Sequence, residues 1–305
     1  MTRLLQILLL LSLATDAMAQ SLAERLGYRA TDRLLIVNAD DVGMSHEANA
    51  ATIDGMENGL MTSGSIMVPC PWFSEIAEYA RSHPQADFGL HLTHTSEWKR
   101  YKWGPVTDRT ETSGLADANG YFWPGIEEVY ANTTPETVEA EARAQIEMAL
   151  KAGIDVTHLD SHMGTMQYDP RFHVPYLKLA QEYDLPIRAG SQETLEAFGV
   201  GDRRQRITEA GVLFPDYLIH GQRLPDESTR DYWTRIVGAL KPGVTELYIH
   251  PAIESDALKQ MTSRWETRVE EYKLFTNDPE MIAVLRGQNV KLIGWRALRE
   301  LQRAD

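Results

Sequence analysis

Residues 34–45 read LLIVNADDVGMS, and this stretch decides how the rest of the chain is interpreted. An apolar run that predicts a buried strand stops at two adjacent aspartates, Asp40 and Asp41, just before Gly43. Neighbouring carboxylates repel each other, and burying one without a partner costs several kcal/mol or shifts its pKa. The pair therefore indicates either a functional site at the end of a core strand or a cap for the helix that follows.

Strand-like and helical patterns alternate along the remaining sequence, which predicts parallel strands joined by helical crossovers. Eight candidate strands suit a TIM-barrel-like (β/α)-barrel, and an open doubly wound sheet is the alternative. In both architectures the carboxyl ends of the strands carry the functional site. The candidate strands are residues 34–39, 64–69, 86–92, 155–160, 186–190, 217–221, 246–251 and 291–295.

Residues 1–19 have the pattern of a secretory signal peptide: a basic Arg3, an apolar core and small residues before a cleavage point after Ala19. We therefore expect a mature chain of residues 20–305 that forms one α/β domain and is periplasmic or secreted. An uncleaved N-terminal anchor is the alternative. The apolar run is about half the length that a membrane-spanning helix needs.

The composition limits the partners. The chain has 30 basic and 44 acidic residues, a net charge of −14, which argues against nucleic acid or an anionic membrane surface as the main partner. The single cysteine, Cys70, excludes an intramolecular disulfide and a thiolate metal cluster, and we interpret it as a buried thiol. The sequence leaves the oligomeric state open.

Histidines and aspartates gather at the predicted carboxyl ends of four strands. Such a group is how oxygen and imidazole ligands for one divalent metal ion are assembled. Each member also has a simpler explanation, since a lone histidine is often a hydrogen-bonded core residue, but four unrelated strands would have to end this way by chance. The residues are Asp40, Asp41, His91, His94, His158, Asp160, His162 and His250.

This composition suits a metal-dependent hydrolase. One carboxylate would bind the cation while its neighbour acts as general base, and a histidine opposite would protonate the leaving group. The expected cofactor is one divalent ion, zinc or magnesium. Two imidazoles with one carboxylate fit zinc or a late transition metal better than magnesium.

The segments LLIVNADDVGMS, GLHLT, THLDSH and HPA, in this order, resemble the YdjC-like carbohydrate deacetylases over about residues 33–296. The resemblance implies a (β/α)-barrel-like fold, a divalent metal held by one aspartate and two histidines, and removal of acetyl groups from N-acetylated sugars such as chito-oligosaccharides. The substrate and partner would be an acetylated carbohydrate.

The resemblance also implies roles for individual residues. Met163, Gly164 and Thr165 follow DSH where many relatives have further histidines, so His158 is the alternative to His162 as third ligand. If His162 is the ligand, His158 and Asp160 would orient the ligands from behind. The implied roles are metal ligand for Asp41, His91 and His162, catalytic base for Asp40, general acid or substrate contact for His250, and support of the ionised base for Arg188.

An excursion over residues 95–134 is longer than a barrel loop needs and predicts a functional lid. Its Trp98, Trp103 and Trp123 would stack on sugar rings or pack within the loop, and the substrate could differ from chito-oligosaccharides. Two alternative functions remain at this stage. A metal-dependent phosphoesterase would need more basic groups than Arg188, whereas a non-catalytic sugar-binding barrel would not need Asp40 free.

Overall fold

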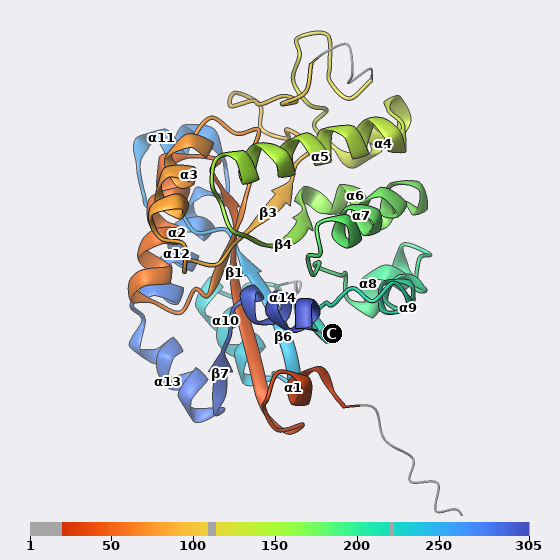
Figure 1. Ribbon diagram of the computed structural model, residues 1–305. Helices are drawn as coiled ribbons and strands as arrows, with labels where there is room; N and C mark the ends of the chain where they lie inside the picture. The colour runs from red at the N-terminus through yellow and green to blue at the C-terminus, as the bar shows by residue number, and fades with distance from the viewer. Residues whose placement is uncertain (1–19, 109–113, 220–222, 305) are drawn as a thin grey trace, which may run out of the picture.

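The computed structural model describes residues 20–108, 114–219 and 223–304, which form an α/β structure built on a parallel sheet (Figure 1). The sheet has seven strands, in the order β4-β3-β2-β1-β6-β5, and β7 also pairs with β1. Parallel strands joined by helices were predicted from the sequence, and this part of the prediction is confirmed. The strands are β1 Arg33–Val42, β2 Ser63–Ile66, β3 Phe88–Leu92, β4 Val156–Ser161, β5 Tyr217–Ile219, β6 Gly243–Ile249 and β7 Val290–Leu292.

The predicted closed barrel of eight strands is wrong, because the curled sheet stays open. β4 and β5 are its two edges, so it resembles half of a barrel. The expected strand at 186–190 makes one isolated bridge, between Leu159 and Ile187, and does not pair with β5 in the part of the chain that the structure describes. Pro186 has no N–H to donate to a ladder, and the Ile187 N–H bonds instead to the Leu213 carbonyl, so pairing stops there.

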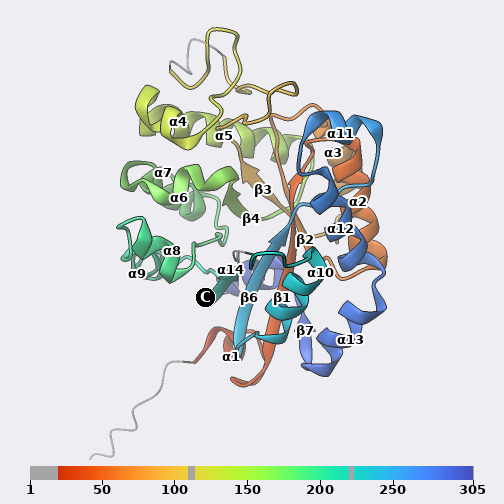
Figure 2. The ribbon, with the colours of Figure 1, turned by 180° about the vertical axis from the view of Figure 1, so that it is seen from behind.

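Helices cover both faces of the sheet (Figures 1 and 2). Local sequence explains their starts: in α5, Thr134 caps the first turn and Pro135 occupies the first helical position. The helices are α1 Leu22–Arg25, α2 His46–Asn58, α3 Phe73–Ser82, α4 Ile126–Asn132, α5 Pro135–Lys151, the 3₁₀ turn η1 His162–Gly164, α6 Thr165–Tyr168, α7 Pro170–Glu182, α8 Gln192–Ala197, α9 Arg203–Glu209, α10 Thr229–Gly238, α11 Asp256–Met261, α12 Trp265–Thr276, α13 Pro279–Gly287 and α14 Trp295–Ala304.

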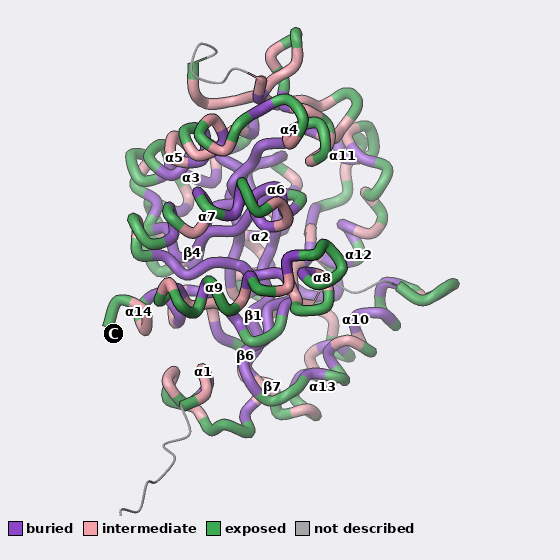
Figure 3. Tube along the Cα trace, turned by 90° about the vertical axis from the view of Figure 1, so that its right-hand side faces the viewer, coloured by how far each residue is buried: buried purple, intermediate pink, exposed green. Residues whose placement is uncertain are grey.

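The long strand β1 has different neighbours along its length. On one side it pairs with β6, while on the other side Arg33 is opposite Val290 of β7 and Asn38 is opposite Ser63 of β2. Almost every residue of β1 is buried, as the continuous purple centre of Figure 3 shows. A strand covered on both faces explains why residues 34–37 are all apolar rather than alternating with polar residues.

Of the excursion predicted over residues 95–134, the described residues 95–108 and 114–125 form loops at the upper end of the molecule in Figure 1, above α5, and α4 follows at Ile126–Asn132. A hydrogen bond from the Tyr101 hydroxyl to the Met44 carbonyl (2.7 Å) fastens it to the segment that follows β1. Within the described ranges, no helix has both the length and the apolar character needed to cross a membrane. The predicted signal peptide, 1–19, lies outside the described residues.

Candidate metal centre

The aspartate pair lies near the end of β1, at an irregularity in its pairing with β2 between Ala39 and Val42. Asp41 has a left-handed backbone (φ +62°) and Gly43 follows with φ +87°, so the chain turns sharply. A left-handed conformation is uncommon outside glycine, although aspartate tolerates it better than most residues. Ser45 caps α2 by accepting a hydrogen bond from the Ala48 N–H at 3.3 Å. The helix-cap explanation of the aspartates is therefore wrong.

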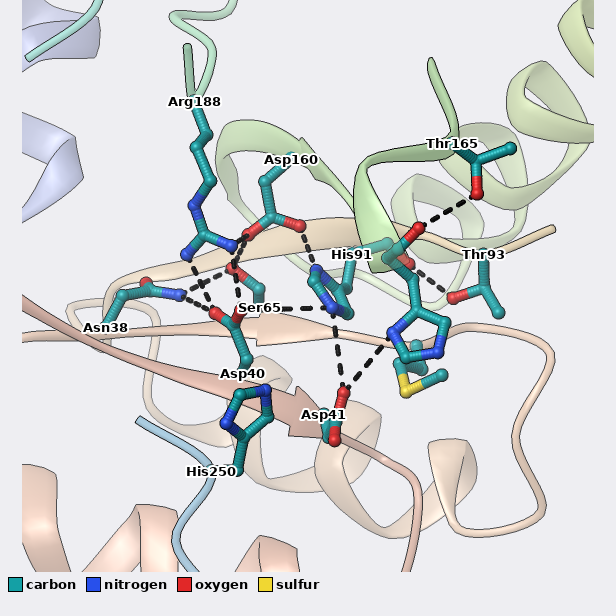
Figure 4. A network of polar contacts seen from close by, with 12 residues as sticks. Asn38, Asp40, Asp41, Ser65, His91, Thr93, Asp160, Thr165, Arg188 and His250 are labelled. Atoms are coloured by element: carbon teal, nitrogen blue, oxygen red, sulfur yellow. Dashed lines mark hydrogen bonds and ion pairs between the residues drawn. The ribbon is translucent and has the colours of Figure 1, made fainter. Parts of the chain in front are cut away.

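Three of the predicted metal ligands, Asp41, His91 and His162, lie together at the carboxyl ends of β1, β3 and β4. Figure 4 shows Asp41 beside His91. The Oδ1 atom of Asp41 is 3.6 Å from Nε2 of His91 and 3.5 Å from Nδ1 of His162. The three candidate ligand atoms all lie within 4.8 Å of one another, and all three residues are buried. Asp41 Oδ1 has no hydrogen-bond partner among the described residues, so a buried acceptor faces two imidazoles. One carboxylate and two imidazoles are a suitable donor set for a divalent cation.

The second nitrogen of His91 is held from behind by Asp160, whose carboxylate accepts from Nδ1. This leaves Nε2 to point at Asp41, as expected for a histidine ligand oriented by a carboxylate. Burial alone would lower the pKa of His91, but the surrounding carboxylates of Asp160, Asp40 and Asp41 raise it to about 9. The three carboxylates around this imidazole therefore favour positive charge at this position.

His158 lies one layer further back and does not join the cluster. Its Nε2 is 2.9 Å from the Ser65 hydroxyl, which in turn donates to Asp160 at 2.7 Å. Its ring stacks on Trp295 with 4.5 Å between ring centroids, and burial lowers its pKa to about 3. Of the two histidines that the sequence left open as third ligand, the structure places His162 beside Asp41.

Asp40 is held on a different set of partners from its neighbour. Both of its oxygens accept hydrogen bonds from Arg188, at 2.7 and 2.8 Å, and Asn38 donates to Oδ1 at 2.8 Å. The same guanidinium binds Glu246 at 2.8 Å and lies over the Tyr248 ring at 4.6 Å. Arg188, which was expected to support the ionised base, therefore forms a two-pronged ion pair with Asp40 that fixes the plane of its carboxylate.

Two charged residues at the centre were missed from the sequence. Arg268 of α12 donates from Nη2 to Asp41 Oδ2 at 2.5 Å, while its Nε and Nη1 have no partner in the described chain. Burial by itself would raise the pKa of Asp41, but Arg268 and the nearby histidines hold it well below its usual range. On the other side of the cluster, Glu97 lies 3.0 Å from His162 Nε2. Asp41 and His162 therefore both have charged partners that the strand pattern could not reveal.

The cluster lies at the floor of a cavity of about 1220 Å³. His250, just after β6, lines this cavity beside Asp40 and Asp41 (Figure 4), and burial lowers its pKa to about 4. Its backbone N–H donates to Glu271 at 2.8 Å, which fixes the turn that carries the ring. Trp98 also lines the cavity, with the Arg268 guanidinium 5.2 Å from its ring centroid. A cavity of this size is large enough to hold a small-molecule ligand.

Trp103 and His94, which the sequence also offered as candidate site residues, lie in the core instead of lining the cavity. Trp103 is only 3% exposed, donates from Nε1 to the Thr95 carbonyl at 2.8 Å and does not line the cavity. The predicted stacking of Trp103 on a sugar ring is therefore wrong, because its faces are covered by neighbouring side chains. His94 is likewise a core residue, since it is fully buried with Nε2 3.2 Å from the Val138 carbonyl.

The fold and the site together define a class: an α/β protein with an open parallel sheet and a buried aspartate–histidine cluster suited to a divalent cation. The sequence profile described as YdjC-like protein matches residues 34–286, and the chain belongs to this family. It is 33% identical over 284 residues to a carbohydrate deacetylase of Thermus thermophilus, which covers 92% of this chain and 98% of that protein. A carbohydrate deacetylase of Thermoanaerobacter pseudethanolicus is 27% identical over 267 residues, covering 88% and 100% respectively.

A solved structure from Enterococcus faecalis, titled a "putative cellobiose-phosphate cleavage protein", superposes with a TM-score of 0.76 at 26% identity. The match covers 88% of this chain and 99% of that one. The open, curled sheet is therefore shared with an experimentally determined relative.

Proposed function

We propose that the protein is a metal-dependent hydrolase that removes acetyl groups from an acetylated carbohydrate, with an N-acetylated sugar or oligosaccharide as substrate. Relatives that this chain matches over nearly their whole length are named carbohydrate deacetylases. The observation that carries the proposal is the contrast within the aspartate pair. Asp41 presents an unpaired buried oxygen to His91 and His162, whereas Asp40 beside it is held by Arg188.

Asp41, His91 and His162 would hold the cation, which when bound polarises the acetyl carbonyl and makes water a stronger acid. Asp40 would take the proton from the attacking water, because it borders the same cavity and Arg188 fixes its orientation. That proton must then reach the leaving nitrogen or oxygen of the sugar. His250 is the side chain that we propose to deliver it, since its ring lies beside the aspartate pair and lines the same cavity.

Trp98 is the candidate for contact with a sugar ring. It is half-buried, lines the cavity and stands on the excursion at the cavity wall. Aromatic faces and aliphatic sugar faces pack well, and Arg268 already occupies part of the Trp98 surface. We propose that the excursion selects the substrate through contact between Trp98 and a sugar ring, on the side of the excursion that lines the cavity.

The proposal is tested by metal analysis of the purified protein, followed by acetate release from a panel of N- and O-acetylated oligosaccharides. The expected result is one divalent ion per chain and acetate release that a chelator abolishes and added metal restores. His162→Ala should lower metal content and activity together. His94→Gln, a buried histidine outside the cluster, is the matched control and should retain both. Full metal content without acetate release from any glycan would instead favour a sugar-binding protein.

We further propose that the protein is exported and that residues 1–19 are removed after Ala19. The basic start, the apolar run and the small residues before Ala19 support this. Fractionation of cells that express the full chain, with sequencing of the mature N-terminus, tests it. A cytoplasmic protein that retains residue 1 would contradict the proposal.

A further inference from the structure

A second cavity, of about 600 Å³, lies between α7 and the segment that leads into α9. It shares no lining residue with the cavity at the aspartate–histidine cluster. Three of its side chains are basic, Lys178, Arg203 and Arg206, and His173 of α7 forms part of its wall. Lys178 is paired with Glu139 and Arg206 with Asp202, which also lines the cavity, so Arg203 is the basic group that remains.

Arg203 is the residue without a structural explanation. It is only 4% exposed, yet its guanidinium has neither an ion pair nor a hydrogen bond with any residue in the described ranges. A buried charge without a partner is strongly unfavourable, and removing the partner of a buried ion pair costs about 3–5 kcal/mol. Proteins therefore rarely leave a buried arginine in this state.

The carboxylates nearest to Arg203 are already paired elsewhere. Asp202 accepts from Arg206 Nε at 2.6 Å, and Asp169 accepts from Arg171 at 2.8 Å. Each acidic group therefore has its own arginine. Asp202 and Asp169 act on Arg203 only at longer range, and neither carboxylate makes a direct pair with its guanidinium.

His173 adds a second unpaired group to the same cavity. It is 4% exposed, and neither of its ring nitrogens makes a hydrogen bond of acceptable geometry, although the Met166 carbonyl lies near the ring. Burial, together with Arg203 and Arg206, lowers the pKa of His173 to about 4, so the ring is neutral at pH 7. A neutral imidazole still has one N–H to donate.

We propose that this cavity binds a small oxyanion group, phosphate or carboxylate, between Arg203 of α9 and His173 of α7. A guanidinium presents two parallel N–H groups that match both kinds of anion. The bound group would supply the direct ion pair that Arg203 does not make with the described residues and would accept the imidazole N–H. Nothing in the proposed deacetylation requires this second site.

The site would also connect two parts of the structure that frame the main cavity. Phe198, between α8 and α9, stacks on Tyr168 with 4.3 Å between ring centroids, and Tyr168 lines the main cavity. An anion that joins α9 to α7 would therefore stabilise the segment behind one wall of that cavity. This is the place where the sheet is open, beyond β4 (Figure 2).

The experiment compares the wild-type protein with Arg203→Gln in inorganic phosphate and in acetate, with ionic strength held constant by sodium chloride. We expect a saturable rise in Tm of about 2–5 °C for the wild type with at least one of the two anions. Calorimetric titration should show that Arg203→Gln binds this anion at least tenfold more weakly. His173→Phe, which lacks the donor, should also bind it more weakly.

Arg230→Gln is the matched control, because it makes the same charge change at an exposed arginine of α10 that is paired with Asp278. It should bind the anion as the wild type does. Without anion, Arg203→Gln should be at least as stable as the wild type, because it removes an uncompensated buried charge. The proposal is overturned if neither anion shows saturable binding, or if Arg203→Gln binds it as tightly as the control.

Discussion

Two adjacent residues of one strand have opposite surroundings at the centre of this protein. Both oxygens of Asp40 accept hydrogen bonds, from Arg188 and Asn38. In Asp41, Oδ2 accepts one from Arg268, whereas Oδ1 has no hydrogen-bond partner among the described residues. The left-handed backbone at Asp41 contributes to this difference, because it turns the second side chain out of the strand alternation that the first one follows. The two carboxylates are therefore expected to serve different purposes.

Their asparagine variants should fail in different ways. Asp41→Asn removes an anionic ligand, so metal content and activity should fall together. Asp40→Asn keeps the three candidate ligands but has no basic oxygen to take a proton, so kcat should fall about 10²–10⁴-fold with the cation still bound. Metal analysis and steady-state kinetics on the same samples separate the two outcomes. Loss of metal from Asp40→Asn and its retention in Asp41→Asn would exchange the roles.

Asp87, at the start of β3, gives a pH dependence that can be assigned to one side chain. Burial raises its pKa to about 6, despite hydrogen bonds from the Thr157 hydroxyl and the Arg296 N–H. The folded pKa lies above the ordinary value of 3.8, so the folded state binds this proton more tightly. The contribution to stability is thus fully present below pH 4 and is lost as the pH rises through about 6.

Replacing Asp87 by Asn should remove this dependence. Two pKa units correspond to about 3 kcal/mol, so the free energy of unfolding of the wild type relative to Asp87→Asn should decrease by about that amount between pH 4 and pH 7. Denaturant unfolding of both proteins at several pH values measures the difference. A difference that stays constant with pH would mean that Asp87 is ionised in the folded protein throughout this range.

The sequence allowed the residues at the strand ends to be predicted, but not those that reach the site from elsewhere. Asp41, His91 and His162 could be found because the carboxyl ends of parallel strands meet on one side of a sheet. Arg268 lies in a helix, and Glu97 lies in an irregular loop. In a linear pattern both resemble ordinary solvated charges, and only the folded chain brings them to Asp41 and His162.

Among the secondary-structure elements, the positions of the strands were predicted well, but the closure of the sheet into a barrel was not. Seven of the eight candidate segments overlap a strand, whereas 186–190 contributes Arg188 to the site without forming one. The local apolar pattern of that segment is strand-like, but whether a sheet closes depends on where distant edges lie. The N–H of Ile187 is taken by Leu213, and this long-range contact has no signature in the pattern.

Of the three tryptophans in the excursion over 95–134, Trp98 and Trp103 should respond differently to replacement. Trp98→Ala should raise KM for oligosaccharides with little change in stability, since its ring is half-buried at the cavity wall. Trp103→Ala should instead cost about 3–5 kcal/mol, because a fully packed aromatic ring is lost from the core. Kinetics and denaturant unfolding of both variants test this. Equal stability loss in the two would make Trp98 a packing residue as well.

Across the whole molecule, the site depends on support from the far end of the chain. Trp295, the first residue of α14, stacks on His158 and donates from Nε1 to Glu246, which binds Arg188. Its backbone N–H also bonds to Ser63 of β2, 232 residues away. The Trp295 side chain therefore supports two parts of the site: Asp160, through His158 and Ser65, and Arg188, through Glu246.

Trp295→Ala should destabilise the protein by about 3–5 kcal/mol, whereas Trp295→Phe, which keeps the stacking, should cost much less. Because the change lies beneath the ligands rather than among them, the folded fraction of Trp295→Phe should still bind metal. Unfolding curves and metal content of the two variants provide the measurement. A large loss of stability in Trp295→Phe would place the main contribution in the indole N–H.

The contact between Trp295 and Ser63 has a consequence for the order of events during biosynthesis. β1 to β4 leave the ribosome long before α14 is made, and their aspartates and histidines gain Arg188, Glu246, Arg268 and finally the Trp295 indole in that order along the chain. A nascent chain that ends before α12 contains Arg188, the partner of Asp40, but lacks Arg268, the partner of Asp41. We therefore expect the amino-terminal half to stay loosely structured during translation and the final collapse to be slow, as is usual for sheets in which neighbouring strands, such as β1 and β6, are far apart in the sequence.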